Sequence, residues 1–220
     1  MATELTIATA VTAGAVFVGL LIGWGLHHNL GTLAYRRDTE QHLPTPPHQW
    51  TIPLYTAAGA GLVAFRANQT GNWQPALLAL PVLVLGIWLA AVDADVQRLP
   101  FRQVAILGLL ETVALVGITI ATRSPHTAIL GAAGGLLSYG AFRLFHHATH
   151  GALGYGDVTL AAPLGAAATA AGGPILTWWW VFLSFAAAGI YALATRRKDD
   201  RALGPWLVFG AVLALSMGNP

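Results

Sequence analysis

Residues 158–195 read VTLAAPLGAAATAAGGPILTWWWVFLSFAAAGIYALAT and contain no charged side chain. A helix that spans a bilayer needs about 20 predominantly apolar residues, so this stretch is long enough for two spans. Gly172-Gly173-Pro174 lies near its middle, and we place the break there because Gly and Pro interrupt helices. The stretch therefore predicts a membrane protein built from helices.

The composition of the whole chain supports the same class. Its 220 residues are 55% hydrophobic and 9% charged, against about 25% charged residues in an ordinary soluble domain, and the mean hydropathy is +0.61. So few charges argue against a soluble enzyme, a disordered chain or a nucleic-acid-binding domain, and a net charge of +2 makes no basic patch. We expect no nucleic-acid partner. Because the chain has no cysteine, disulfides, zinc–thiolate sites and cysteine nucleophiles are excluded.

Dividing the chain at its charges and turn residues predicts one all-α domain, residues 1–220, as a polytopic bundle of about eight membrane-spanning helices. The second and sixth spans are short and rich in Gly and Ala, so a bundle of seven is the main alternative. The first span lacks a basic n-region and is too long for an h-region, so we expect a permanent helix rather than a cleaved signal peptide. The expected spans are Leu5–His28, Thr51–Phe65, Trp73–Val92, Gln103–Ala121, Thr127–Leu144, Val158–Ala171, Ile175–Ala194 and Ala202–Met217.

The basic residues predict the orientation of this bundle. With the N-terminus outside, one side of the membrane receives only Arg66 and Arg123 of the 11 Lys and Arg residues. Lys and Arg accumulate in cytoplasmic loops, which places the other side in the cytoplasm of a multi-pass inner (plasma) membrane protein. That side receives Arg36, Arg37, Arg98, Arg102, Arg143, Arg196, Arg197, Lys198 and Arg201.

Four acids lie within or against the spans, namely Asp93, Asp95, Glu111 and Asp157, and such acids are functional candidates because they are costly in a membrane. Asp93 ends the third span and Asp157 begins the sixth, so both lie at a similar depth on the predicted cytoplasmic side. Two converging carboxylates share a proton, as aspartic-protease chemistry requires. Asp93 and Asp95 are about 200° apart on a helix, so one of them is expected to be a solvated boundary acid. Spacing alone does not choose between them.

Two glycines precede Asp157 in Gly154-Tyr155-Gly156. One interpretation is that they let the backbone bend and approach a substrate or a neighbouring helix closely. The alternative is a flexible loop before a carboxylate that the helix dipole favours.

Together, Asp93 followed after six residues by Pro100, and Gly154-Tyr155-Gly156-Asp157 at the head of a later span, resemble the type IV prepilin peptidase family of GxGD membrane aspartyl proteases. The resemblance is strong over roughly residues 73–164 and weaker elsewhere, and the core motif region is about residues 73–165. It implies that Asp93 and Asp157 are catalytic, and that Gly154, Gly156, Asp95 and Pro100 support the motif or contact substrate.

The resemblance also implies a prokaryotic enzyme in contact with the lipid bilayer. Its substrates would be type IV prepilin-like precursors, whose basic leader is removed at the cytoplasmic face. No metal or organic cofactor is implied.

The first cytoplasmic loop departs from the family pattern. Bifunctional members carry a cysteine-rich domain there and also N-methylate the mature pilin. In this chain the loop is short, residues 34–50, and contains no cysteine. The N-methyltransferase activity is therefore not expected. In addition, Phe101 follows the motif proline, where the family often has Asp or Asn.

Other polar residues have structural interpretations. We expect Glu111 to be a buried, protonated residue with a structural hydrogen bond, in preference to a third active-site group or a proton path. His146, His147 and His150 are expected to be loop residues or lipid-headgroup contacts rather than zinc ligands. The rival functions are a small transporter or channel that uses the boundary acids, and an inactive family member that aids assembly.

Overall fold

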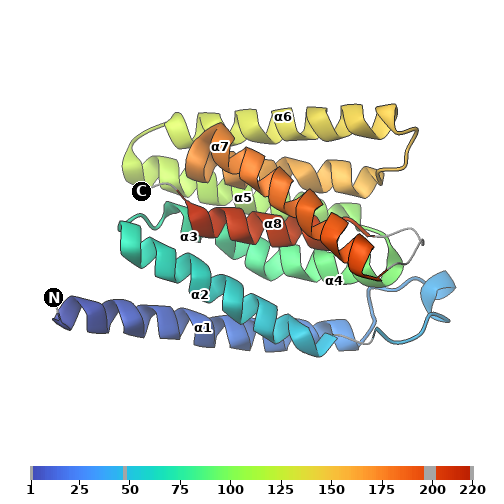
Figure 1. Cartoon of the computed structure of the whole chain (residues 1–220), viewed down its shortest axis with the longest axis horizontal. Coiled ribbons are helices and arrows are strands. Elements are labelled where there is room, and N and C mark those ends of the chain that lie inside the picture. Colours follow the sequence, from blue (N-terminus) through green and yellow to red (C-terminus); the bar gives the residue numbers. More distant parts are fainter. Residues whose placement is uncertain (1, 47–48, 196–201, 219–220) are drawn as a thin grey trace.

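The computed structural model describes residues 2–46, 49–195 and 202–218, and within these ranges the chain is helical and contains no β-strand (Figure 1). The predicted all-α bundle is thus confirmed. Its helices are α1 (Ala2–Gly31), α2 (Ile52–Thr70), α3 (Gln74–Pro81), α4 (Ile87–Val96), α5 (Phe101–Thr122), α6 (His126–Ala148), α7 (Tyr155–Thr195) and α8 (Gly204–Met217).

Each predicted span falls on a helical segment, and two of the segments are irregular. A π-helical turn, η3 (Val82–Gly86), joins α3 to α4, so these three elements form one continuous helical stretch. The helix α7 is kinked where predicted, because Gly172 and Gly173 leave helical geometry and Gly173 has a φ of 68°. Such a positive φ is accessible to glycine at little cost.

Five helical stretches are long and apolar enough to cross a membrane, and the kinked α7 counts as one of them. The helix α8 is a shorter apolar helix of 14 residues. The number of spans and the position of the N-terminus stay predictions. The five stretches are Thr6–Gly31, Gln74–Val96, Phe101–Thr122, His126–Ala148 and Tyr155–Thr195.

Close helix pairs build the bundle around a shared apolar core. The helix α1 lies along α2, and α6 lies along the first half of α7 (Figure 1). Small residues permit this approach, since a Cβ on Gly134 of α6 would lie 2.9 Å from the carbonyl oxygen of Gly165 on α7. Fully buried side chains from α3, α4, α5, α7 and α8 fill the centre, among them Leu78, Leu89, Leu107, Leu160, Leu164, Trp180 and Leu207.

One end of the bundle, at the right in Figure 1, carries connections whose described parts include residues 32–46, 97–100 and 149–154. We call it the motif end, because Asp93 and Asp157 lie beside these connections. Arg66 near the end of α2 and Arg123 after α5 belong to the opposite end, in keeping with the predicted segregation of basic residues. The basic residues 196–198 and 201, used to predict the orientation, lie outside the described residues.

Candidate active site

Asp93 lies in the last turn of α4 and faces the interior, with 5% of its surface exposed. The helix ends just beyond it, where Gln97 adopts a left-handed conformation and donates its backbone N–H to the carbonyl oxygen of Asp93 at 2.9 Å. The Oδ2 atom of Asp93 accepts the backbone N–H of Gly204 at 3.0 Å. Asp93 is therefore a buried carboxylate fixed against the start of α8.

Asp157 lies in the first turn of α7 and is 8% exposed. Its backbone N–H bonds to the carbonyl oxygen of Gly154 at 3.1 Å, and a Cβ on Gly154 would lie 3.1 Å from Asp157 Oδ2. A Cβ on Gly156 would lie 2.9 Å from the Cβ of Leu99, the residue before Pro100. Gly156 thus allows the segment to pack against the α4–α5 turn, which is the close backbone approach considered from the sequence, and Gly154 leaves room for the Asp157 carboxylate.

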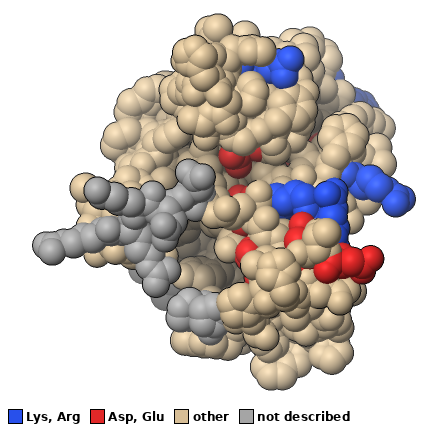
Figure 2. Space-filling model, turned by 90° about the vertical axis from the view of Figure 1, so that its right-hand side faces the viewer, with Lys and Arg blue, Asp and Glu red and all other residues tan. Residues whose placement is uncertain are grey.

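The two carboxylates come together at the motif end. Asp93 ends α4 and Asp157 begins α7, and the two carboxyl groups are near enough for a Coulombic interaction between them. The Oδ1 atom of Asp157 is buried without a hydrogen-bond partner in the part of the chain that the structure describes. Figure 2 looks onto this end and shows acidic side chains inside a hollow between the helices. Like charges this close are not both ionised cheaply, so the pair can hold one proton between them.

Asp95 is not a solvated boundary acid, so that expectation is wrong. Its side chain is 5% exposed and forms a two-pronged ion pair with Arg36, whose Nε and Nη2 donate to the two carboxylate oxygens at 2.7 and 2.6 Å. The phenol of Tyr35 donates to Asp95 Oδ2 at 2.6 Å. As predicted, Asp95 faces away from Asp93, because its partners come from residues 35–36 rather than from α8.

Two ion pairs tie the connection between α1 and α2 to the end of α4. The second pair joins Arg98 and Glu40, whose Nη2 and Oε2 atoms lie 3.0 Å apart. The hydrogen bonds that Arg98 donates to Glu40 hold the pKa of Glu40 below its ordinary value. Burial, together with the bond to Asp95, raises the pKa of the Tyr35 phenol well above its usual range. The connection is thus fastened next to the aspartates by paired charges.

Glu111 is buried in the middle of α5, as expected, with 1% of its surface exposed. The expected structural hydrogen bond is wrong, however, because neither carboxyl oxygen has a partner among residues 2–46, 49–195 and 202–218. Its neighbours on the buried face of α5 are the apolar Leu107 and Leu115. An apolar setting of this kind favours a neutral carboxyl group.

The histidines do not assemble into a metal site in the described ranges, where no group of three His, Asp or Glu residues could hold an ion. The Nδ1 atom of His146 instead lies 2.6 Å from the carbonyl oxygen of Leu153, and its ring packs edge-on against Tyr155. His146 therefore fastens the α6–α7 connection.

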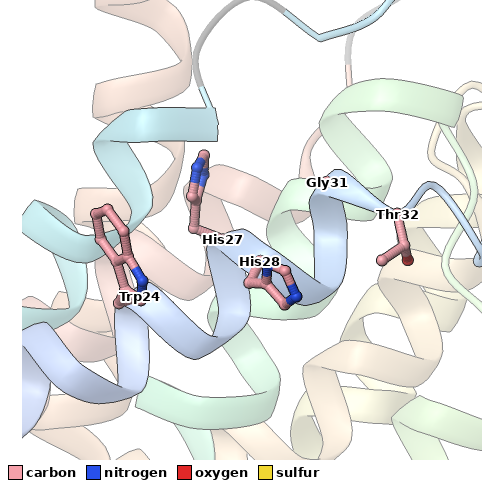
Figure 3. Close-up of a pocket in the computed structure, with 5 residues that line it drawn as sticks. All are labelled: Trp24, His27, His28, Gly31 and Thr32. Atoms are coloured by element: carbon pink, nitrogen blue, oxygen red, sulfur yellow. The ribbon is translucent and has the colours of Figure 1, made fainter.

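A separate hollow of about 370 Å³ lies against the end of α1 and is lined by Trp24, His27, His28, Gly31 and Thr32 (Figure 3). Trp24 and His27 project to one side of the helix and His28 to another. Neither aspartate lines this hollow, so it is distinct from the candidate site.

Three residues at the motif end were missed as site residues from sequence: Tyr35, Arg36 and Gly204. In the sequence, Arg36 served only to predict the orientation of the bundle. Gly204 only precedes Pro205 near the start of the last predicted span. Their contacts with α4 join residues 59 to 111 positions apart, and no local pattern in one sequence marks such pairs.

Comparison with known proteins gives one match for this chain. The type IV leader peptidase family matches residues 78–195, a range that contains α4, both aspartates and the helices between them. No curated protein matches the chain, and no solved structure does. The matched region spans more than half of the chain and includes the convergent carboxylates, and the chain belongs to the type IV leader peptidase family.

Proposed function

We propose that this protein is a leader peptidase that cleaves the N-terminal leader from type IV pilin-like precursors at the cytoplasmic face of the inner membrane, with Asp93 and Asp157 as its catalytic dyad. The observation that carries the proposal is the convergence of these two buried carboxylates from separate helices, α4 and α7, at the motif end. Membership of a peptidase family supports the reaction class.

The proposed chemistry uses one proton shared by two carboxyl groups. The ionised carboxylate draws a proton from a water molecule as that water attacks the scissile carbonyl carbon. The protonated partner donates a hydrogen bond to the carbonyl oxygen and stabilises the charge that develops there. Collapse of the tetrahedral intermediate then breaks the C–N bond, and the leaving nitrogen takes the proton that the first carboxylate accepted from water. The Oδ1 of Asp157, which has no partner among the described residues, leaves one carboxyl oxygen uncommitted for this exchange, and the proposed mechanism needs no metal or organic cofactor.

The substrate is expected to lie extended beside the dyad. Its apolar helix would remain in the bilayer, while the leader and the attacking water reach Asp93 and Asp157 from the cytoplasm. The hollow in Figure 2 supports this direction of approach, since the acidic side chains are visible from the motif end.

Cleavage is proposed without N-methylation. The connection between α1 and α2 contains only two short 3-10 turns, η1 (Asp38–Glu40) and η2 (Gln49–Thr51), in its described part, and the sequence has no cysteine. It is held by ion pairs to α4 rather than built as a separate domain.

The decisive experiment is co-expression of the full chain with candidate prepilins from the same genome, read out as loss of the leader mass. Asp93→Asn and Asp157→Asn should each lower cleavage by about 10²–10⁴-fold, the usual contribution of a general acid or base. The double variant should be no worse than either single variant, because members of one catalytic unit are not additive.

Asp38→Asn is the matched control, since Asp38 is an exposed acid near the motif end whose carboxylate accepts a bond from Gln41. It should cleave like the wild type. Normal cleavage by both dyad variants would refute the protease, and a proton or cation flux assay in liposomes would then test the transporter alternative.

A further inference from the structure

The start of α8 directly contacts the candidate dyad. The backbone N–H of Gly204 donates to Asp93 Oδ2 at 3.0 Å, and both groups are buried. This residue lies 111 positions after Asp93 and beyond the region 78–195 that matches the family. The dyad is thus supported by a third element besides the two helices that carry it.

The first turn of α8 leaves this N–H available for Asp93. Pro205 follows and has no N–H to donate. The N–H groups of Trp206 and Leu207 instead bond to the carbonyl oxygen of Leu203, at 2.9 and 3.1 Å. The start of a helix carries a partial positive charge, and a hydrogen bond to an ionised group is stronger than one between neutral groups. The arrangement therefore favours a negative charge on Asp93.

The contact also depends on the absence of a side chain at residue 204. A Cβ there would lie 2.6 Å from Asp93 Oδ2 and 3.1 Å from its Cγ. Contacts below 3.0 Å force one group to move, and here the atom in the way belongs to the carboxylate itself. Any residue other than glycine would displace Asp93 from its present position.

We propose that Gly204 is a positioning residue for Asp93: its N–H fixes the carboxylate and holds it as the ionised member of the dyad. Asp157 also lies at a helix start and interacts with the backbone N–H of Gly154, but its Oδ1 has no partner in the described part of the chain, and it then carries the shared proton. The catalytic meaning of this assignment rests on the proposed peptidase function, whereas the charge and position of Asp93 do not.

The first test separates positioning from packing through kcat and KM. Gly204→Ala should lower kcat by about 10²-fold, because a misplacement of about 1 Å at a reacting group costs about that much. The KM should stay unchanged, because residue 204 contacts Asp93 and not the peptide. Gly210→Ala, in the same helix α8, is the matched control: the new Cβ would lie 2.8 Å from the carbonyl oxygen of Trp180 on α7, and neither aspartate is among its near neighbours. It should lower the melting temperature and leave kcat unchanged.

A second variant removes the donor without adding an atom. Gly204→glycolate, introduced by cell-free synthesis, replaces the N–H with an ester oxygen and should lower kcat in the same direction. Equal kcat in the glycolate variant and the wild type would overturn the proposal, as would equal losses of kcat in Gly204→Ala and Gly210→Ala.

Infrared difference spectroscopy tests the assignment without any substrate. At neutral pH, the difference between wild type and Asp93→Asn should contain a carboxylate band, and the difference with Asp157→Asn a protonated carboxyl band. The carboxylate band of Asp93 should shift in Gly204→glycolate. An unshifted band, or the two bands exchanged between the residues, would refute the inference even if cleavage is normal. Shifted bands in a protein that does not cleave prepilins would refute only the peptidase.

Discussion

Replacing Asp95 with alanine is expected to destabilise the protein by about 3 kcal/mol while leaving the dyad in place. The change removes the two carboxylate oxygens that accept from Arg36, whose side chain is 2% exposed. Breaking a buried ion pair on one side costs about 3–5 kcal/mol. The lower end applies because Arg36 keeps bonds to the carbonyl oxygens of Leu43 and Pro44, each at 2.8 Å. By the usual scaling for chains of this size, the melting temperature should fall by about 6–12 °C.

The assay is thermal unfolding of the detergent-solubilised chain, followed by tryptophan fluorescence in a double-mutant cycle. Arg36→Met should be destabilising on its own, and the Arg36→Met/Asp95→Ala pair should cost less than the two single changes together, because no buried charge is left unpaired. Arg37→Met is the matched control, since Arg37 is the exposed neighbour of Arg36. Strict additivity, or a wild-type melting temperature for Asp95→Ala, would refute the argument, as would a loss of kcat in the folded fraction comparable to that of a dyad variant.

Four further outcomes are expected. Glu111→Gln should cleave normally, because its buried carboxyl group has no described hydrogen-bond partner to lose; an inactive variant would make it part of the site. A cysteine at residue 147 should be labelled from the cytoplasm and one at residue 72 from outside, and the reverse would overturn the orientation. Mass spectrometry of the mature substrate should find an unmethylated N-terminus, and methylation by this chain alone would contradict that. Glu40→Gln should lower the melting temperature at pH 7. This difference should vanish in acid, because Arg98 lowers the pKa of Glu40 and the pair's stabilisation is lost as the pH falls through that lowered value; a difference that persists in acid would contradict this.

The helices and the two aspartates were within reach of sequence analysis because their signals are local. Uncharged stretches of sufficient length predict helices in a membrane, and Gly172-Gly173 marks a break by conformation alone. Asp93 and Asp157 stand out because an acid at the edge of an apolar stretch is rare and costly. The predicted spans also place both aspartates at one end of the bundle, because the number of membrane crossings between them returns the chain to the same side.

The partners of these acids could not be predicted from the sequence, because the residues around a buried acid do not indicate which distant group pairs with it. Spacing alone did not distinguish Asp93 from Asp95, two acids at one helix end, and only the resemblance to a family separated them. The structure distinguishes them by their partners. A guanidinium and a phenol bind Asp95, whereas in the described part of the chain Asp93 accepts one backbone N–H and lies near a second carboxylate. Pairing with a cation makes Asp95 a structural acid, whereas no cation pairs with Asp93 among the described residues, which is consistent with its proposed role as a base. Residues 35–36 and 204 therefore distinguish the structural acid Asp95 from the candidate base Asp93. They lie far from these acids in the sequence, so no local sequence pattern links them.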